Sequence, residues 1–524
     1  MVAAVLSCLL RGLDAQLVEV QADAGPGKAG FNLTGLAGSD VKDSRERVRS
    51  AIRNSGARFP AQRLIVNLAP AELRKEGAAF DLPIAVAIAL AEARQAPPES
   101  TAFLGQLDLD GSLRHVNGVL PAARALRAAG VETLVLPAAD AEEAALVEGL
   151  HIRPAASLRE VLGHLSGDRP LPSRPHAVPE PGDPAGADDL AEVHGQEAAK
   201  RALEIAAAGG HHLLLSGPPG SGKTMLARCL PGVLPALGFD EAIEVSQIES
   251  VLGMLEGRPL RWERPFRSPH HSISTAGLVG GGGGLARPGE VSRAHHGVLF
   301  MDELAEFSAA SLQALRQPLE EGRVTITRAL GAVTYPARFQ LVAATNPCPC
   351  GWLGSEDGRC RCAPTSVEAY RRGISGPLLD RIDLRVNVSR PPLIAMGGAP
   401  AGEPSAAVRA RVVAARARQL TRQGAVNATL KAAALREHAA LGVRRRQLPQ
   451  RRRERFEREL RRRDRLHLQR RPGLRRADRR GVDLGLSGHR RAGHRRSGHQ
   501  LEYGHHLHPE RDRPRRHDRR RDLP

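Results

Sequence analysis

The sequence predicts an α/β protein in which an N-terminal α+β domain precedes a layered αβα domain built around a glycine-rich turn. Short apolar runs alternate with helical patterns along the first 393 residues, as in α/β folds. The glycine-rich turn follows one of these apolar runs, within 212–224. The chain of 524 residues is long enough for about two to four domains with buried cores. It has no apolar stretch of roughly 18 residues, so no membrane-spanning helix and no membrane partner are expected.

Residues 1–165 are predicted to form the first domain, because strand and helix patterns alternate within them. Their apolar opening lacks the basic start of a secretion signal, and we interpret it as a first strand. The other predicted strands are 15–24, 63–70 and 131–137, and the predicted helices are 39–56 and 81–95.

Composition indicates the later boundaries. Residues 166–188 are rich in proline and have no apolar periodicity, which predicts a linker. Residues 189–393 again alternate strands and helices and predict a second α/β domain. Residues 394–442 predict the start of a C-terminal helical region, and 443–524 form an arginine-rich tail.

Positive charge is concentrated in this tail. The formal net charge is +19, and residues 443–524 contribute +18 of it with 29 Arg, no Lys and 11 acidic residues. One interpretation of the tail is a basic arm that neutralises DNA phosphates, and another is a solvated linker. The rest of the chain is nearly neutral, so DNA contact there requires local patches. A predicted loop at 277–296 carries two candidate phosphate contacts, Arg287 and Arg293, although a solvated loop is an equal alternative.

The turn has the spacing G-x-x-x-x-G-K-T and lies between a predicted strand at 211–216 and a predicted helix at 224–234. In that context, backbone N–H groups surround phosphates at the start of a helix. Lys223 is expected to reach the β- and γ-phosphates and Thr224 to ligate Mg²⁺. The expected nucleotide-binding residues are Gly217, Pro218, Pro219, Gly220, Ser221, Gly222, Lys223 and Thr224. The alternative is a glycine-rich turn with a chance Lys-Thr.

Two further predicted strands end in polar residues suited to phosphoryl transfer. The segment 297–307 is an apolar run ending in Asp302, expected to hold Mg²⁺, and Glu303, expected to polarise the attacking water. An acidic helix cap is the alternative for either carboxylate alone. The run 338–346 ends in Asn346, which is placed to contact a γ-phosphate or align water.

Arg381 lies on a predicted turn within 376–386, between apolar residues. An arginine at such a position is suited to stabilise charge on a neighbouring subunit's ATP. The alternative is a local ion pair with Asp380 or Asp383.

Together these motifs resemble the AAA+ ATPases and, within them, the magnesium-chelatase-like branch that includes the ComM and YifB proteins. The matching strings are RPFRSPHHSIS (264–274), GEVSRAHHGVLFMDEL (289–304), LRQPLEEGRVTI (315–326), ATNPCPCG (344–351) and SGPLLDRIDL (375–384). The resemblance covers about 190–393 and continues through the N-terminal domain. It implies the following site residues: Lys223 and Thr224 in Walker A, Asp302 and Glu303 in Walker B, Asn346 as sensor 1 and Arg381 as the arginine finger.

The resemblance also implies ATP and Mg²⁺ as cofactors and a cytoplasmic homo-oligomer, in this family a hexameric ring. It implies a motor that remodels DNA, with branch migration during recombination or natural transformation as the form of remodelling. Two alternatives stay open. One is the motor subunit of a magnesium chelatase-type complex, and the other is a nucleotide-binding adaptor with impaired hydrolysis.

The N-terminal domain resembles the chelatase-type domain with the Lon protease fold, which is of the ribosomal S5 domain 2 type. The strings at 74–90 and 104–130 carry this match. Lon-type proteolysis requires a Ser nucleophile and a Lys base. Residues 75–95 contain no Ser and 104–130 contain no Lys, so we expect the scaffold without peptidase chemistry.

Four of the six cysteines lie within fifteen residues, which favours a metal site in a reducing compartment over disulfides. They form an insertion at 348–362 and are predicted to hold Zn²⁺ as four thiolates. They are Cys348, Cys350, Cys360 and Cys362. The C-x-C spacing is tighter than usual, and reduced surface thiols are the alternative. Two histidine pairs, His270–His271 and His295–His296, are interpreted as polar loop residues that contact substrate or a neighbouring subunit, with metal binding as the alternative.

Family members are expected to continue from 435–441 into a helical lid with a sensor-2 arginine. Past Gly442 no amphipathic period survives, and Arg, His and Gly dominate. We therefore expect the lid to be lost or scrambled and hypothesise a reading-frame shift near Gly442. A chain without the lid is expected to bind ATP but hydrolyse it poorly.

Overall fold

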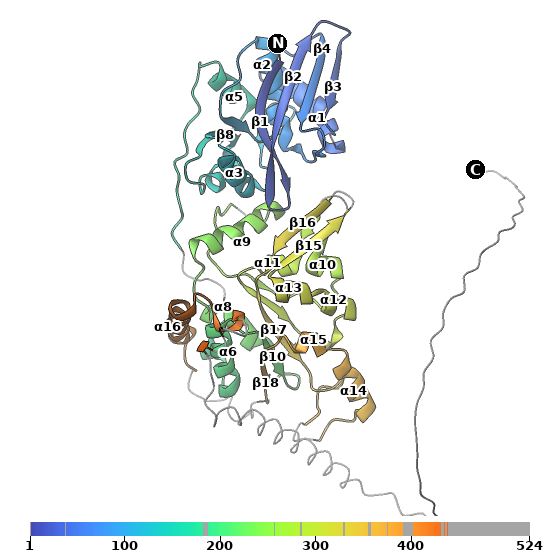
Figure 1. The fold of residues 1–524 in the computed structure, drawn as a ribbon, viewed down its shortest axis with the longest axis vertical. Coiled ribbons are helices and arrows are strands. Elements are labelled where there is room, and N and C mark those ends of the chain that lie inside the picture. The colour runs from blue at the N-terminus through green and yellow to red at the C-terminus, as the bar shows by residue number, and fades with distance from the viewer. Residues whose placement is uncertain are drawn as a thin grey trace, which may run out of the picture. The chain divides into compact units, whose positions relative to one another are not determined.

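The computed structural model describes residues 2–438 with gaps (Figure 1). The gaps are 37, 182–186, 256, 283–285, 329–330, 355–357, 375, 391–401, 431–433 and 435–436. The arginine-rich tail and any lid past Gly442 lie outside the described residues, and the predictions made for them remain predictions.

A mixed seven-stranded sheet forms the core of the N-terminal region (Figure 1). Its order is β3 (Gly30–Thr34), β4 (Arg63–Ala69), β2 (Asp14–Gly25), β1 (Val2–Arg11), β5 (Thr101–Phe103), β8 (Thr133–Pro137) and β9 (His151–Ala155). The long strands β1 and β2 pair antiparallel, with Val5 opposite Val20, whereas β1, β5, β8 and β9 run parallel. The predicted first strand and those at 15–24, 63–70 and 131–137 are confirmed.

Helices pack on this sheet to bury its apolar residues. They are α1 (Ser39–Asn54), α2 (Asp81–Ala93), α3 (Val119–Ala128), α4 (Ala141–Ala144) and α5 (Leu158–Leu165). The two predicted helices, 39–56 and 81–95, are therefore confirmed as α1 and α2. Helix α2 is apolar on nearly every face because it is buried in the first core, between the sheet and α1.

Lys75 lies in the segment that resembles Lon, and its side chain bonds to the backbone of this domain. Its side chain is fully buried, and its Nζ donates hydrogen bonds to the carbonyls of Leu68 (2.8 Å), Gly35 (3.1 Å) and Pro70. Burial is the main cause that lowers its pKa. The ammonium therefore holds three backbone carbonyls together.

A five-stranded parallel sheet forms the core of the second α/β region. Its order is β11 (Phe266–Arg267), β14 (Val298–Met301), β17 (Gln340–Thr345), β10 (Leu213–Ser216) and β18 (Leu384–Asn387). Ser216 lies opposite Thr345, and Met301 lies opposite Ala343. The carboxyl ends of β10, β14 and β17 therefore reach the same edge, where ligands bind in open α/β sheets.

Helices cover both faces of this sheet, because its side chains alternate between two cores. Leu213 and Leu215 enter one core with α6 (Glu197–Gly209) and α16 (Ser405–Gln423), while Leu214 enters the other. The αβα layering is thus confirmed. The predicted helix at 224–234 is two helices, α7 (Lys223–Arg228) and α8 (Leu230–Val233), because Pro231 lies in the first turn of the second.

The helix α9 (Phe239–Leu252) contacts both regions. Its Ile243 belongs to a hydrophobic cluster with Leu120 of α3. The hydroxyl of Ser250 donates a hydrogen bond to the buried carboxylate of Glu143. The backbone carbonyl of Ser250 accepts the N–H of Gly118 (3.0 Å). Among the described residues, α9 is therefore a helix of the second region that shares a core with the first.

The predicted loop at 277–296 is partly structured. It includes β12 (Gly280–Gly281), β13 (Arg287–Pro288) and α11 (Glu290–Arg293), which correct that prediction. The remaining helices and strands are β6 (Gln106–Leu107), β7 (Leu113–Arg114), α10 (Thr275–Val279), α12 (Ala309–Ala314), α13 (Arg316–Glu321), β15 (Arg323–Arg328), β16 (Gly331–Pro336), α14 (Pro364–Arg372) and α15 (Gly376–Leu379). The 3-10 turns are η1 (Ala78–Phe80), η2 (Ala138–Asp140), η3 (Leu190–Glu192), η4 (Leu304–Glu306) and η6 (Asn427–Thr429).

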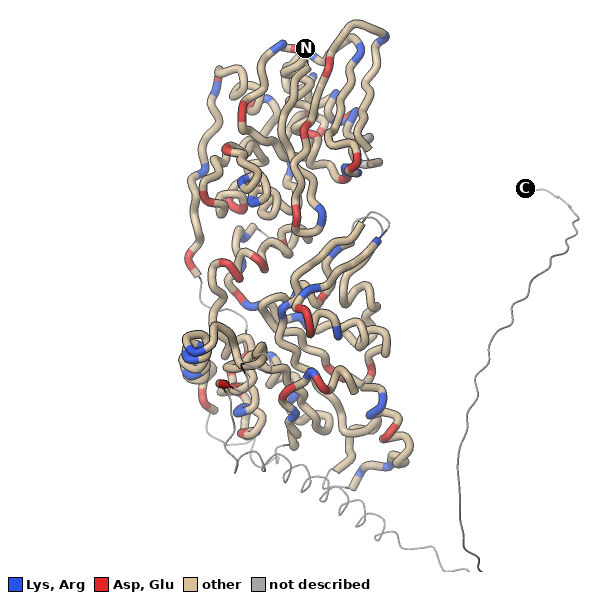
Figure 2. Tube along the Cα trace, viewed as in Figure 1, with Lys and Arg blue, Asp and Glu red and all other residues tan. Residues whose placement is uncertain are grey.

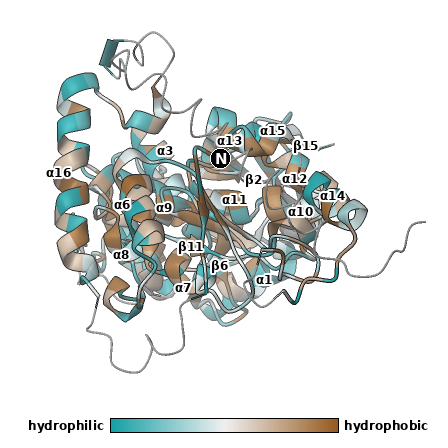
Figure 3. Cartoon of the chain, turned by 90° about the horizontal axis from the view of Figure 1, so that it is seen from below, coloured by the Kyte–Doolittle hydropathy of each residue, from teal (hydrophilic) through white to brown (hydrophobic). Residues whose placement is uncertain are grey.

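Charges of both signs are interspersed over the described residues, and basic residues gather on α16 (Figure 2). Hydrophobic ribbon is concentrated between the helices around β11, whereas α16 is largely hydrophilic or intermediate (Figure 3). No described helix is long and apolar enough to cross a membrane.

Candidate nucleotide-binding site

The glycine-rich turn 217–222 connects β10 to α7, as the sequence predicts. Gly220 and Gly222 have φ of +71° and +86°, in the left-handed region that favours glycine. A Cβ on Gly217 would lie 2.1 Å from the carbonyl oxygen of Val388. The backbone is therefore held in a shape that side chains would disturb, and this shape leaves room for phosphate oxygens beside the N–H groups.

Lys223, the first residue of α7, points back across this turn. Its Nζ donates to the carbonyls of Gly217 (2.8 Å) and Pro218 (3.0 Å) and lies 3.3 Å from Oδ1 of Asn346. The structure thus brings together two residues that are 123 positions apart in the chain. An ammonium held by three oxygens at the mouth of the turn is placed to exchange them for phosphate oxygens.

Thr224 and Asp302 form the part of the site suited to Mg²⁺. The Thr224 hydroxyl donates to Oδ2 of Asp302 (2.8 Å), and Oδ1 of Asp302 accepts the N–H of Glu303 (2.9 Å). Mg²⁺ prefers hydroxyl and carboxylate oxygens, so this donor set fits the ion. Burial, as the larger cause, lowers the pKa of Lys223, and the carboxylates of Asp302 and Glu303 oppose that shift.

Glu303 is exposed and has a φ of +51°, an uncommon conformation for a residue with a side chain. Its Oε2 lies 3.3 Å from Nδ1 of His271, whose ring packs at a tilt of 35° to that of His270 with centroids 4.1 Å apart. The sequence predicts that His271 contacts substrate or a neighbouring subunit, and within this chain it contacts the second carboxylate of the site. This contact could have been predicted only from the strand order. His271 follows β11, Glu303 follows β14, and these two strands are neighbours in the sheet.

These groups surround a cavity of about 430 Å³, a volume typical of small-molecule sites. Its lining is Pro219, Gly220, Ser221, Gly222, Lys223, Thr224, Met225, Asp302, Glu303, Thr345 and Asn346. Two predicted binding residues, Gly217 and Pro218, lie outside this lining and contribute carbonyls to Lys223. The predicted site residues from three strand ends therefore meet at one cavity.

Tyr370, on α14, is a neighbour of the site that the sequence did not indicate. It lies close to the side chain of Thr345 and the backbone of Asn346, and burial is the main cause that raises its pKa. It is therefore a neighbour of the end of β17. The long interval between β17 and α14 gave no pattern from which this contact could be predicted.

Arg381 lies apart from the cavity lining among the described residues. Its guanidinium is half exposed and pairs with the carboxylate of Glu320. The sequence alternative, a pair with Asp380 or Asp383, is corrected by this contact, since Asp383 pairs with Nδ1 of His211 (2.9 Å).

The four clustered cysteines come together at the segment after β17. Sγ of Cys348 lies 3.4 Å from that of Cys350 and 3.8 Å from that of Cys360, and the last two are 3.7 Å apart. Cys362 completes a group whose sulfurs all lie within 4.8 Å. None of these distances is that of a disulfide, which is about 2.05 Å.

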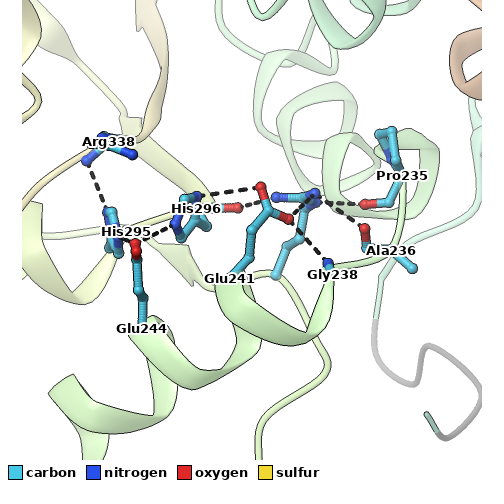
Figure 4. Close-up of polar contacts among 9 residues, drawn as sticks. Pro235, Ala236, Gly238, Glu241, Glu244, His295, His296 and Arg338 are labelled. Atoms are coloured by element: carbon cyan, nitrogen blue, oxygen red, sulfur yellow. Dashed lines mark hydrogen bonds and ion pairs between the residues drawn. The ribbon is translucent and has the colours of Figure 1, made fainter. Parts of the chain in front are cut away.

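The histidine pair before β14 is part of a partly buried hydrogen-bonded cluster (Figure 4). His295 and His296 both place Nε2 2.8 Å from Oε2 of Glu244 on α9. The N–H of Arg338 donates to Nδ1 of His295 (3.0 Å), so the neutral ring carries its proton on Nε2 and donates it to Glu244. Burial, as the largest cause, lowers the pKa of His295 to about 4. This tautomer has no lone pair for a metal at Nε2. The pair lies in the turn between α11 and β14, as the sequence predicts, but His295 is fully buried and is therefore not available to contact substrate or a neighbouring subunit.

A second acid of α9 extends the same cluster. Glu241 accepts a hydrogen bond from the guanidinium of Arg264 (3.0 Å), which also donates to carbonyls of Pro235, Ala236 (3.2 Å) and His296. Figure 4 shows Glu241, Pro235 and Ala236 on α9 and the segment before it, and His296 on a different segment. Hydrogen bonds therefore connect α9 to the residues just before β14, the strand that leads to Asp302.

Of the two candidate phosphate contacts, Arg293 is already engaged. Its guanidinium pairs with Glu290 and lies 3.5 Å from the sulfur of Met254, and Glu290 also accepts two bonds from Arg267 (2.7 and 3.1 Å). Arg287 is exposed. The structure therefore favours only Arg287 for a contact outside the chain.

A parallel sheet with a glycine-rich turn, a lysine and carboxylates at one edge defines a P-loop protein of the αβα class. The family described as magnesium chelatase, subunit ChlI, matches residues 189–395. Its N-terminal counterpart, subunit ChlI of Mg-chelatase, matches 18–140, and the ChlI C-terminal region matches 402–468.

Several curated proteins are similar over most of the chain. An uncharacterized protein of Mycobacterium tuberculosis H37Rv is 48% identical over 415 residues, which cover 78% of this chain and 81% of that protein. YifB of Escherichia coli K12 is 42% identical over 439 residues, and competence protein ComM of Haemophilus influenzae is 44% identical over 440. Each of these two alignments covers 82% of this chain and 84% of the relative. The chain belongs to the YifB/ComM family of magnesium-chelatase-like AAA+ proteins.

Two predictions remain open beside this assignment. A weaker match, 29% identical over 187 residues, links the chain to Lon protease 2 of Bacillus subtilis and covers 30% of this chain. The Lon-like fold of the N-terminal domain therefore stays a prediction. The C-terminal family match extends past Gly442 into the tail, and the predicted loss of the lid stays a prediction because those residues are not described.

Proposed function

We propose that the chain is a cytoplasmic ATP-hydrolysing motor that assembles into a ring and remodels DNA. The observation that carries the hydrolytic part is the convergence of Lys223, Thr224, Asp302, Glu303 and Asn346 on one cavity, from three strand ends. Membership of an AAA+ family supports the same activity.

Each of these side chains has a distinct role in the proposal. Lys223 binds the β- and γ-phosphates, and Thr224 with Asp302 holds Mg²⁺. The ion supplies neutralisation of phosphate charge when bound. Glu303 orients and polarises the attacking water, and Asn346 aligns that water or the γ-phosphate.

We place Arg381 in the neighbouring subunit's site. It is half exposed, and it does not line its own cavity among the described residues. A group that acts on the next subunit requires a head-to-tail contact, and such contacts close into rings. A homo-hexamer is the ring proposed from the family resemblance. The ion pair with Glu320 has to open, or rotate, for Arg381 to reach a phosphate.

DNA is proposed as the substrate, with branch migration as the reaction. One relative is a competence protein, ComM, and this supports a role in transformation. The exposed Arg287 and the arginine-rich residues 443–524 supply positive charge for phosphate contacts.

The test is ATPase activity of the full chain with no DNA, linear duplex DNA and a four-way DNA junction. Wild type is expected to be stimulated most by the junction, and Lys223→Ala is expected to lose both basal and stimulated activity. Lys28→Ala, which removes an exposed lysine, is the matched control. ATP hydrolysis that is lost in Lys223→Ala but indifferent to every DNA would contradict the DNA substrate and leave the motor intact.

A second candidate is the motor subunit of a magnesium chelatase-type complex, favoured by the family matches to ChlI along three segments. DNA-independent ATPase activity is the result that would select it. The third, an adaptor with impaired hydrolysis, predicts tight ATP binding with no turnover under any of these conditions.

A further inference from the structure

The four clustered sulfurs have the geometry of a tetrahedral metal site. With Zn–S bonds of about 2.3 Å, the edges of a ZnS₄ tetrahedron measure about 3.8 Å. The three resolved edges here are 3.4, 3.8 and 3.7 Å, and the fourth sulfur lies within 4.8 Å of the others. A [4Fe–4S] cluster separates its thiolates much further, so a single ion is the occupant that fits.

The four sulfurs bring together the two ends of the segment 348–362, which is called the excursion below. Cys348 is fully buried, whereas Cys350 is exposed and Cys360 and Cys362 are half-buried. Between the two pairs, the guanidinium of Arg359 lies 5.1 Å from the ring centre of Trp352. One face of the group is thus protein and the other solvent, which gives an ion a way in.

The same segment packs directly on the nucleotide site. Gly351 has a φ of +80°, and a Cβ there would lie 2.6 Å from Cδ of Pro219 in the glycine-rich turn and 3.8 Å from Cγ of Asn346. Cys348 follows Asn346 by two residues. After the excursion, the chain returns through α14, where Tyr370 lies close to the backbone of Asn346.

We propose that Cys348, Cys350, Cys360 and Cys362 bind one Zn²⁺ and that this ion holds Asn346 in place against the glycine-rich turn. The ion joins the two ends of the excursion next to Asn346, the residue that contacts Lys223. Asn346 is therefore held by β17 on one side and by the metal site on the other. This second part rests on the proposed nucleotide site, whereas the metal site itself does not.

The metal site is tested on the full chain, purified without chelator or affinity metal. Elemental analysis is expected to give one Zn per chain. Exchange with Co²⁺ is expected to give the intense visible absorption and the sulfur-to-cobalt charge-transfer band of tetrahedral thiolate coordination. Less than a tenth of an equivalent of metal, together with a Co²⁺ spectrum lacking both features, would overturn the site.

Two single variants test the role of the ion. Cys360→Ser is expected to lose the stoichiometric metal and the cobalt spectrum, while Cys8→Ala, which removes a buried thiol of β1, keeps both. Metal retained at one equivalent in Cys360→Ser would contradict the four-thiolate site. Without the ion, Asn346 is no longer held where it is proposed to contact the γ-phosphate. Cys360→Ser is therefore expected to bind a non-hydrolysable ATP analogue about tenfold more weakly, the cost of one hydrogen bond to a charged group.

The metal-free state of the wild-type chain provides the same comparison without a substitution. Stripping with a chelator and restoring with Zn²⁺ is expected to weaken and then restore analogue affinity. Analogue affinity unchanged by stripping, in a chain shown to release its metal, would overturn the positioning role and leave the proposed ATPase unaffected. No analogue binding in either state would instead contradict the proposed function.

Discussion

Replacing Lys223 by Met separates two effects of its ammonium: the free energy that its burial costs the folded protein, and the free energy that it contributes to nucleotide binding. The ammonium donates to the carbonyls of Gly217 and Pro218 and lies near Asn346, yet burial still lowers its pKa. A lowered pKa means that, at pH 7, the folded protein favours the charged form less than the unfolded chain does. Removing the charge is therefore expected to leave the unfolding temperature without nucleotide unchanged or higher.

With nucleotide the sign reverses. At an analogue concentration of 100 Kd, wild type gains about 2.7 kcal/mol, which is about 5–11 °C for a domain of roughly 200 residues. Loss of charge-assisted bonds to phosphate costs roughly 10–150-fold in affinity. The same concentration then gives Lys223→Met only about 0.3–1.4 kcal/mol.

Thermal unfolding with and without the Mg²⁺ complex of a non-hydrolysable ATP analogue measures both effects. Lys28→Met is the control, since it removes an exposed lysine and should behave like wild type. A variant Lys223→Met that is stabilised by nucleotide as much as wild type would refute the assigned contact. One that is strongly destabilised without nucleotide would refute the argument from burial.

Three further predictions follow from contacts in the described residues. Gly217→Ala is expected to lower ATP affinity at least tenfold in a binding titration, because its Cβ would lie 2.1 Å from a backbone carbonyl oxygen; unchanged affinity would contradict the close packing. Glu244→Ala leaves the buried N–H of His295 unpaired and is expected to cost about 1–3 kcal/mol in denaturant unfolding at pH 7. Hydrogen bonds from histidines, that of His295 first, lower the pKa of Glu244 from 4.5 to about 2. The stability that ionised Glu244 contributes is therefore fully present above pH 4.5, and the difference in unfolding free energy between wild type and Glu244→Ala should shrink as the pH falls toward 2. A difference that does not change with pH would argue against this contribution. Arg381→Ala and Lys223→Ala, each inactive alone, are expected to regain ATPase activity when mixed, and mixtures that stay inactive would place Arg381 outside the neighbour's site.

The strand ends of the site were predictable because each carries its own local signal. The apolar runs before Gly217, Asp302 and Asn346 each predict a strand, and parallel strands bring their carboxyl ends to one edge. No contact between distant segments had to be guessed, since the sheet supplies it. The break at Pro231 was missed because the apolar pattern continues through it.

Contacts between segments without a shared sheet were not predictable. Glu244 meets His295 across 51 residues, and Arg381 meets Glu320 across 61. Nothing local distinguishes these acids from their neighbours, so the sequence predicts the adjacent aspartates as partners of Arg381. His271 is intermediate, because the strand order that places it beside Glu303 appears only in the fold.

The most direct test of the central claim compares ATP binding and single-turnover hydrolysis in wild type and Glu303→Gln. The variant is expected to bind Mg²⁺ and ATP as tightly as wild type, because Lys223, Thr224 and Asp302 are untouched. It is expected to cleave ATP at least about a hundredfold more slowly. Cleavage at the wild-type rate would show that the water is activated elsewhere, and the site described around the cavity would not be the catalytic one.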